Sequence, residues 1–468
     1  MITENRDYDA LVQDINLEDI TSSEHNANIL RQLRDGYLGW TEGLYIIDSE
    51  YDGDIDEFIV GAGDDLGWLG YFIGRSEVLE ALVVDYLPEE GERMDALMRG
   101  ITHNQSITEL SIRTDIGDQG FENLGRFLRS ENALSHINFQ YFHVDTECGH
   151  NIAMALEQCR HDSLRSFELD NSNINEEGFA EIAATLRTQS QLEKMHLRHN
   201  NIGRDGCMAL GNLLRRWQSS NLKCLTLSNN NINDLGLEAL IEGITHFRNL
   251  QNLYLSDNDQ ITAVGIRSMS PLLQSESCSL TELKLHRINF GDDGAIALAD
   301  GLRGNNSLRN LMFAPTSAGI TDMGWSALSK LLCDTSSINS TYLSNHTLER
   351  IGDDFYDDSD TPPIIRQYLA WNREERIDAA IRKILESHPD LDIKPFFHWM
   401  LKFLPVIINW FGRAQEAGLE QSLGGRKLSS VYSFVRGMPM LVIGGHQSQD
   451  QEKTRRRSRK RRLDGETK

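Results

Sequence analysis

Apolar residues recur along this chain in a short unit that combines two periodicities. In residues 221–244, NLKCLTLSNNNINDLGLEALIEGI, Leu225 and Leu227 are two residues apart and therefore share one face of a strand. Gly236, Leu240 and Ile244 follow at intervals of four, which places them on one face of a helix. A strand and a helix of this size cannot bury a core alone. The pattern therefore predicts neighbouring units of the same kind.

Ten segments repeat the strand part of this unit at nearly constant spacing. The first apolar residues of successive segments are 27 to 30 residues apart. Counted from the first apolar residue of each segment, the first, fourth and sixth residues are predicted to line the interior of a parallel sheet, and the side chains that alternate with them in the strand to point outward. The segments are centred on SITELSI, NLKCLTL and their equivalents, and their first apolar residues are Leu79, Ile107, Leu134, Leu164, Leu192, Leu222, Leu250, Leu280, Leu308 and Ile338.

Asparagines and glycines stand at fixed places in the unit. Asn200, Asn230 and Asn258 each follow the last leucine of a strand by three residues, where an amide can donate to carbonyls of the adjacent turn. The alternating period of 28 and 30, the glycines at 178, 206, 236, 265 and 294, and the helix in each unit resemble the ribonuclease-inhibitor-like family of leucine-rich repeats. The resemblance implies an α/β horseshoe solenoid, with a parallel sheet inside and helices outside, that grips other proteins.

The repeats divide the chain into four predicted parts. Residues 1–73 form an acidic N-terminal segment and a degenerate capping repeat, with a short helix near 28–35, a strand in 39–48 and a helix at 65–73. Residues 74–345 hold about ten repeats, 346–444 form an α-helical C-terminal cap, and 445–468 are a disordered basic tail. A cap is expected because a terminal repeat exposes an unpaired face. Its predicted helices lie at 361–387, 396–413 and 426–437.

The composition favours a protein that stays inside the cell. The first residues lack an apolar run, so a cleaved secretory signal is not expected. The most apolar window, 399–411, contains Lys402 and is shorter than the roughly 20 apolar residues that a membrane span needs. Six cysteines occur singly, which suits the thiols of a reducing compartment. These observations predict a cytoplasmic or nuclear protein with no membrane segment.

Charge is unevenly distributed along the chain, whose formal net charge is −24. Residues 1–65 contain 17 acidic and 3 basic residues, whereas 450–468 contain 9 basic and 4 acidic residues. The run KTRRRSRKRR at 453–462 is typical of segments that nuclear-import receptors bind. Nucleic acid is not expected as a partner, because the body is too acidic to follow a phosphate backbone. The predicted import residues are Arg455, Arg456, Arg457, Arg459, Lys460, Arg461 and Arg462.

Neither a metal site nor a catalytic site is predicted. The segment DSEYDGDIDEFI (48–59) resembles a calcium loop, but Ile59 stands where a bidentate glutamate is required. The cysteines and histidines of 143–161 do not match zinc spacings. No P-loop, H-E-x-x-H, G-x-S-x-G or dinucleotide fingerprint occurs. No cofactor is therefore expected.

The outward-pointing strand residues are the predicted partner-binding residues. They are polar or charged with occasional tyrosines, as in recognition surfaces. They comprise Tyr141, Glu168, Asp170, Lys194, His196, Arg198, His199, Asn252, Tyr254, Ser256, Glu282, Lys284, His286 and Arg287.

The leading functional hypothesis is a non-enzymatic scaffold that binds a protein partner, not identified by the sequence, on the concave face. One alternative is a GTPase-activating regulator, because Ran GTPase-activating proteins are similar to this chain in the type and number of repeats. Those proteins carry their acidic segment after the repeats, whereas here it comes first. A second alternative is a nuclear or RNA-associated adaptor that acts through the basic tail. The oligomeric state is left open.

Overall fold

The computed structural model describes residues 8–388, apart from short gaps. The predicted tail and the predicted helices at 396–413 and 426–437 lie outside the described residues. The chain divides into two compact units, Met1–Ala380 and Ile381–Lys468, and the repeats belong to the first. The gaps are 40–42, 49–55, 62–63, 86–90, 115, 131, 142–145, 160–162, 218–220, 246, 315–317, 354–360 and 374–375.

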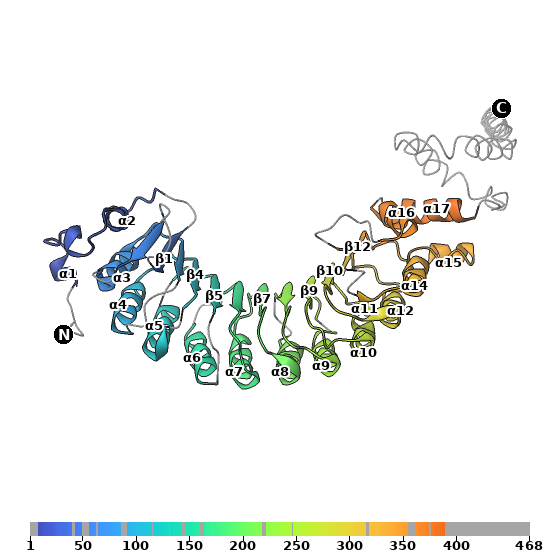
Figure 1. Ribbon diagram of the computed structural model, residues 1–468, viewed down its shortest axis with the longest axis horizontal. Helices are drawn as coiled ribbons and strands as arrows, with labels where there is room; N and C mark the ends of the chain where they lie inside the picture. Colours follow the sequence, from blue (N-terminus) through green and yellow to red (C-terminus); the bar gives the residue numbers. More distant parts are fainter. Residues whose placement is uncertain are drawn as a thin grey trace, which may run out of the picture. The chain divides into compact units, whose positions relative to one another are not determined.

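One parallel sheet of twelve strands runs through the first unit (Figure 1). The strands lie in the order β12 to β3, then β1 and β2. Each strand from β4 to β11 therefore pairs with the strand before it and the strand after it, whereas β3 pairs with β4 and β1. The strands are β1 Leu44–Asp48, β2 Glu57–Val60, β3 Ala81–Val84, β4 Glu109–Ile112, β5 His136–Gln140, β6 Ser166–Asp170, β7 Lys194–His196, β8 Cys224–Thr226, β9 Asn252–Tyr254, β10 Glu282–Lys284, β11 Asn310–Met312 and β12 Arg350–Gly352.

Helices follow the strands and form a second layer against the outer face of the sheet (Figure 1). Neighbouring strands lie about 4.8 Å apart, whereas packed helices need about 8 to 10 Å. The repeat therefore curves with the sheet on its inner side. The helices are α1 Tyr8–Leu11, α2 Glu24–Asp35, α3 Leu66–Arg75, α4 Gly91–Ile101, α5 Gly117–Arg129, α6 Thr146–Glu157, α7 Glu176–Leu186, α8 Gly203–Arg216, α9 Asp234–Ile244, α10 Ala263–Ser268, α11 Ser270–Leu273, α12 Gly291–Gly301, α14 Asp322–Leu332, α15 Ile338–Tyr342, α16 Pro363–Asn372 and α17 Arg376–Ser387.

The predicted interior positions form the core, and the asparagines bond to the adjacent turns as expected. Leu225 and Leu227 are fully buried between strand and helix. The amide of Asn230 donates to the carbonyl of Leu197, 2.6 Å away in the preceding repeat. The amide oxygen of Asn258 in turn accepts from the backbone N–H of Asn230 at 2.9 Å. These bonds satisfy backbone groups that the end of the strand pairing leaves without partners.

Small residues set the spacing of the helix layer. A Cβ atom added to Gly243 on α9 would lie 2.4 Å from the carbonyl oxygen of Gly211 on α8. The carbonyl oxygen belongs to the backbone of α8 and cannot move away as the end of a flexible side chain could. The two helices therefore approach as closely as they do because both positions are glycine.

The N-terminal end contains the predicted degenerate repeat. β1 lies within 39–48 and pairs with both β2 and β3. β2, the edge strand, occupies the C-terminal part of the segment that resembles a calcium loop. Asn26 on α2 covers this edge, since its amide donates to the carbonyl of Ile59 at 2.7 Å and its oxygen accepts from the N–H of the same residue. The predicted helices at 28–35 and 65–73 correspond to α2 and α3.

The prediction of a strand at 337–343 is wrong. Residues Ile338–Tyr342 form the short helix α15, and the strand that pairs with β11 is β12, at Arg350–Gly352. The amide oxygen of Asn345 accepts from the N–H of Leu348, three residues later, as that of Asn305 accepts from Leu308. The structural repeat after Leu308 therefore begins at Leu348, which places the last strand inside the predicted cap segment.

The single helix predicted at 361–387 is two helices, α16 and α17. α16 begins at Pro363, whose missing N–H costs nothing in the first turn of a helix. A hydrogen bond joins the helix to the last repeat, since the amide of Asn372 donates to the carbonyl of Leu348 at 2.6 Å. Ile365 and Leu369 of the same helix are buried. α16 therefore covers the last repeat, as a cap must.

Candidate functional site

The inner face of the sheet presents two cross-strand rows of side chains. Because the strands are parallel and in register, equivalent residues of successive repeats lie side by side. The first row is Glu109, His136, Ser166, Lys194, Cys224, Asn252, Glu282, Asn310 and Arg350. The second row is Ser111, Asn138, Glu168, His196, Thr226, Tyr254, Lys284 and Met312.

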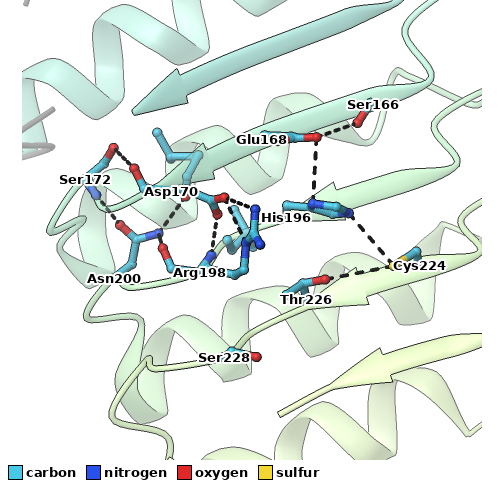
Figure 2. A network of polar contacts seen from close by, with 12 residues as sticks. Ser166, Glu168, Asp170, Ser172, His196, Arg198, Asn200, Cys224, Thr226 and Ser228 are labelled. Atoms are coloured by element: carbon cyan, nitrogen blue, oxygen red, sulfur yellow. Dashed lines mark hydrogen bonds and ion pairs between the residues drawn. The ribbon is translucent and has the colours of Figure 1, made fainter. Parts of the chain in front are cut away.

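A bidentate ion pair stands at the centre of this face. Figure 2 shows the guanidinium of Arg198 against the carboxylate of Asp170, with Nε and Nη2 at 3.0 and 2.7 Å from Oδ2. The other carboxylate oxygen accepts from the Arg198 backbone N–H at 2.6 Å. The Asp170 side chain is 4% exposed, whereas that of Arg198 is 45% exposed. Asp170 therefore fixes the position of Arg198, and Arg198 is the residue that a partner can reach.

Glu168, His196 and Cys224 lie side by side on β6, β7 and β8 (Figure 2). The imidazole is 3.7 Å from the carboxylate of Glu168 and 3.9 Å from the sulfur of Cys224. Burial lowers the pKa of His196, although Glu168 acts in the opposite direction. Burial also raises the pKa of Cys224. The thiolate that nucleophilic chemistry requires is thus disfavoured, and the three groups form a polar contact surface.

Lys194 is an exposed cation of the first row, at β7. It stands between Ser166 and Cys224, neither of which carries a charge that could neutralise it. No carboxylate pairs with it among the residues that the structure describes. The ammonium group of Lys194 can therefore form an ion pair with a carboxylate of another molecule.

A second cluster of charges lies toward the C-terminal end of the inner face. The ammonium group of Lys284 is 3.3 Å from the carboxylate of Glu282 and 5.0 Å from the centre of the Tyr254 ring. The imidazole of His286 lies 3.7 Å from the carboxylate of Asp353, and the backbone N–H of His286 donates to Ser256 Oγ at 3.2 Å. These contacts hold the charged groups in defined positions. Asn252 is the first-row neighbour of Glu282.

Three predicted residues lie beside the inner face instead of on a strand. Tyr141, His199 and Arg287 have positive φ angles of 62°, 55° and 55°. Each follows its strand and occupies the left-handed turn that Asn171, Asn229 and Asp257 form in other repeats. The strands end before these residues, so the prediction of a strand position was wrong for all three. Arg198 and His286 also lie beyond the short strands β7 and β10.

The prediction from the sequence missed residues of this surface, among them Asp353, Cys224 and Thr226. Asp353 escaped because the strand before it was expected at 337–343. Thr226 is the second-row neighbour of His196, and its place could have been found from the repeat spacing alone. The predicted import residues lie outside the described part of the chain. Within that part, no three His, Cys, Asp or Glu side chains converge as a metal site would require.

Comparisons with known proteins agree with the repeat architecture. Residues 190–211, 218–240 and 276–299 match the family model described as Leucine Rich repeat. The chain is 26% identical over 276 residues to the ribonuclease inhibitor of Sus scrofa, covering 57% of this chain and 58% of that protein. This is a leucine-rich-repeat protein of the ribonuclease-inhibitor-like type.

Other leucine-rich-repeat relatives match over shorter stretches. The chain is 28% identical over 173 residues to the protein phosphatase 1 regulatory subunit 37 homolog of Caenorhabditis briggsae, covering 37% of this chain. It spans only 18% of the length of that relative. Among solved structures, the complex of yeast Rad7 and Elc1 aligns with a TM-score of 0.42 and 16% identity, covering 68% of this chain and 76% of that one. In the described residues, no helix has the length and apolar character to cross a membrane.

Proposed function

We propose that this leucine-rich-repeat protein binds a protein partner on the inner face of its sheet, over strands β6 to β10. The observation that carries the proposal is the mutual fixing of the charged side chains there. Asp170 holds Arg198, and Glu282 and Tyr254 hold Lys284. Side chains that are already ordered lose less entropy when a partner arrives.

The residue types on this surface also support protein recognition. Arginine and tyrosine are enriched at the energetically dominant positions of interfaces. Arg198 and Tyr254 supply both types, and Lys194 adds an exposed cation beside them. The surface offers charges of both signs, so it fits a partner with complementary acidic and basic groups better than a uniformly charged polymer.

The names of the relatives point in the same direction. One is named as an inhibitor of a ribonuclease and another as a regulatory subunit of a phosphatase, and each of these names implies contact with another protein. The GTPase-activating and nuclear-adaptor alternatives remain predictions from the sequence.

The test compares charge reversals on and off the proposed surface. Full-length wild type, Lys194→Glu and Lys284→Glu are used for affinity purification with mass spectrometry, with Lys330→Glu as the matched control. Lys330 lies on α14 in the helix layer, with its side chain 58% exposed. A partner is expected to be recovered with wild type and Lys330→Glu and lost with the two inner-face variants.

The candidate partner is then purified and its affinity measured by calorimetry. Loss of a charge pair at a protein interface costs about 2 to 5 kcal/mol, so we expect inner-face reversals to weaken binding at least tenfold. The proposal fails if every recovered protein binds all four chains equally, or if Lys330→Glu weakens binding as much as the inner-face variants do.

A further inference from the structure

Three arginines line one small hollow at the C-terminal end of the repeats. The hollow has a volume of about 120 Å³. It is bounded by Arg350 and Ile351 of β12, by Arg366 and Leu369 of α16, and by Arg373, the residue that caps the C-terminus of α16. It is separate from the inner-face surface over β6 to β10. Three guanidinium groups around one hollow require an explanation in a chain of net charge −24.

The fold, and not the sequence order, brings these arginines together. Arg366 and Arg373 are seven residues apart, which places them on one face of α16, two turns and roughly 10 Å apart. α16 is held against the last strand, where Thr361 donates to the carbonyl of Ile351 at 3.3 Å and Asn372 to that of Leu348. This contact sets both helix arginines beside Arg350.

None of the three arginines is neutralised among the described residues. No carboxylate there lies within ion-pair distance of Arg350, Arg366 or Arg373. By contrast, Arg198 and Arg215 each pair with a carboxylate, Asp170 and Glu242 respectively. Like charges gathered at one place repel one another, and the repulsion is relieved when an anion binds between them.

We propose that this hollow, here called the arginine pocket, binds the phosphate group of a phosphorylated peptide. Guanidinium groups match phosphate oxygens with paired hydrogen bonds, and arginine clusters recognise phosphorylated segments in other proteins. Ile351 and Leu369 contribute apolar lining, against which the carbon atoms of a phosphorylated side chain can pack.

The size of the pocket and the charge of the body favour a single phosphate over a polyanion. A hollow of about 120 Å³ accommodates one compact anionic group. An extended polyanion, such as a nucleic acid or an anionic membrane, would also face the acidic body and be repelled by it. The ligand is therefore expected to be a peptide with an isolated phosphorylated serine or threonine.

The test measures binding of the full-length protein to two labelled peptide pools by fluorescence anisotropy. One pool has a central phosphoserine and randomised flanks, and the other has serine at the same position. The phosphoserine pool is expected to bind at least about tenfold more tightly, because each charge-assisted hydrogen bond contributes roughly tenfold or more. Inorganic phosphate should compete, and rising salt should weaken binding because the arginines are exposed.

Variants assign the binding to the arginine pocket. Arg366→Gln and Arg373→Gln should each weaken phosphopeptide binding about tenfold, whereas the control Arg215→Gln on α8 should bind as wild type does. The side chains are exposed, so circular dichroism melting curves of all variants should match that of wild type.

Three results would overturn the proposal. The first is equal affinity for the two peptide pools. The second is unchanged phosphopeptide binding in the double variant R366Q/R373Q. The third is tighter, pocket-dependent binding to phosphatidylserine vesicles or to a single-stranded oligonucleotide than to the phosphopeptide, which would reassign the pocket to a membrane or to nucleic acid.

Discussion

Replacement of Asn258 by alanine should destabilise the repeats far more than the loss of one exposed side chain would. The Asn258 side chain is fully buried. Its oxygen accepts from the N–H groups of Asn230 and Ile232, at 2.9 and 3.0 Å. Its amide donates to the carbonyls of Leu227 and Leu255, at 3.0 and 2.7 Å. Alanine would leave all four backbone groups without these partners, in a place that water does not reach.

The magnitude follows from the two N–H groups, which lose their acceptor. Each buried donor left unsatisfied costs about 1 to 3 kcal/mol, so Asn258→Ala should lower the free energy of unfolding by about 4 kcal/mol. Asn201→Ala is the control, because Asn201 is exposed and its side chain accepts a hydrogen bond from the side chain of Asn231, which is itself exposed. Its cost should stay below about 1 kcal/mol.

Urea unfolding followed by circular dichroism measures both variants. The reasoning is refuted if the free energy of unfolding of Asn258→Ala stays within about 1 kcal/mol of that of wild type, or if Asn201→Ala lowers it as much as Asn258→Ala does. In either case the buried asparagine does not stabilise the fold by bonding to these backbone groups.

Two further predictions concern the inner face and the helix layer. Burial lowers the pKa of His196, and the positive charges of Arg198 and Lys194 act in the same direction. The carboxylates of Glu168 and Asp170 oppose this shift. Because the pKa is lower in the folded protein, the unfolded chain binds the proton more readily. The free energy of unfolding of wild type should therefore fall as the pH drops below 6.5, and that of His196→Gln should fall less. Urea titrations at several pH values measure both proteins, and the same pH dependence in the two would contradict the prediction. Gly243→Ala should force α8 and α9 apart and cost about 1 to 3 kcal/mol, and an unchanged Tm would refute the close contact.

The position of the last strand shows where a local pattern fails. Residues 337–343 and 348–352 both have apolar residues at strand spacing, but only one segment can pair with β11. Asn345 selects the second segment, because its amide donates to the carbonyls of Leu302 and Asn305 and its oxygen accepts from Leu348. Ile338 and Leu343 remain 38% and 65% exposed. The apolar pattern alone does not indicate which segment follows the asparagine that forms these hydrogen bonds.

The sequence alone determined the repeating unit, since each strand and helix is specified by apolar spacing within about thirty residues. It also determined which asparagines bond to the turns, because that role depends only on their place in the unit. The tertiary structure decided which charged side chains meet, because residues of neighbouring repeats, such as Asp170 and Arg198, are 28 positions apart in sequence. It also decided the arginine pocket, because no repeat pattern relates Arg350 to α16. Local spacing fixes local structure, whereas contacts between charges depend on how the units stack and on what covers the last one.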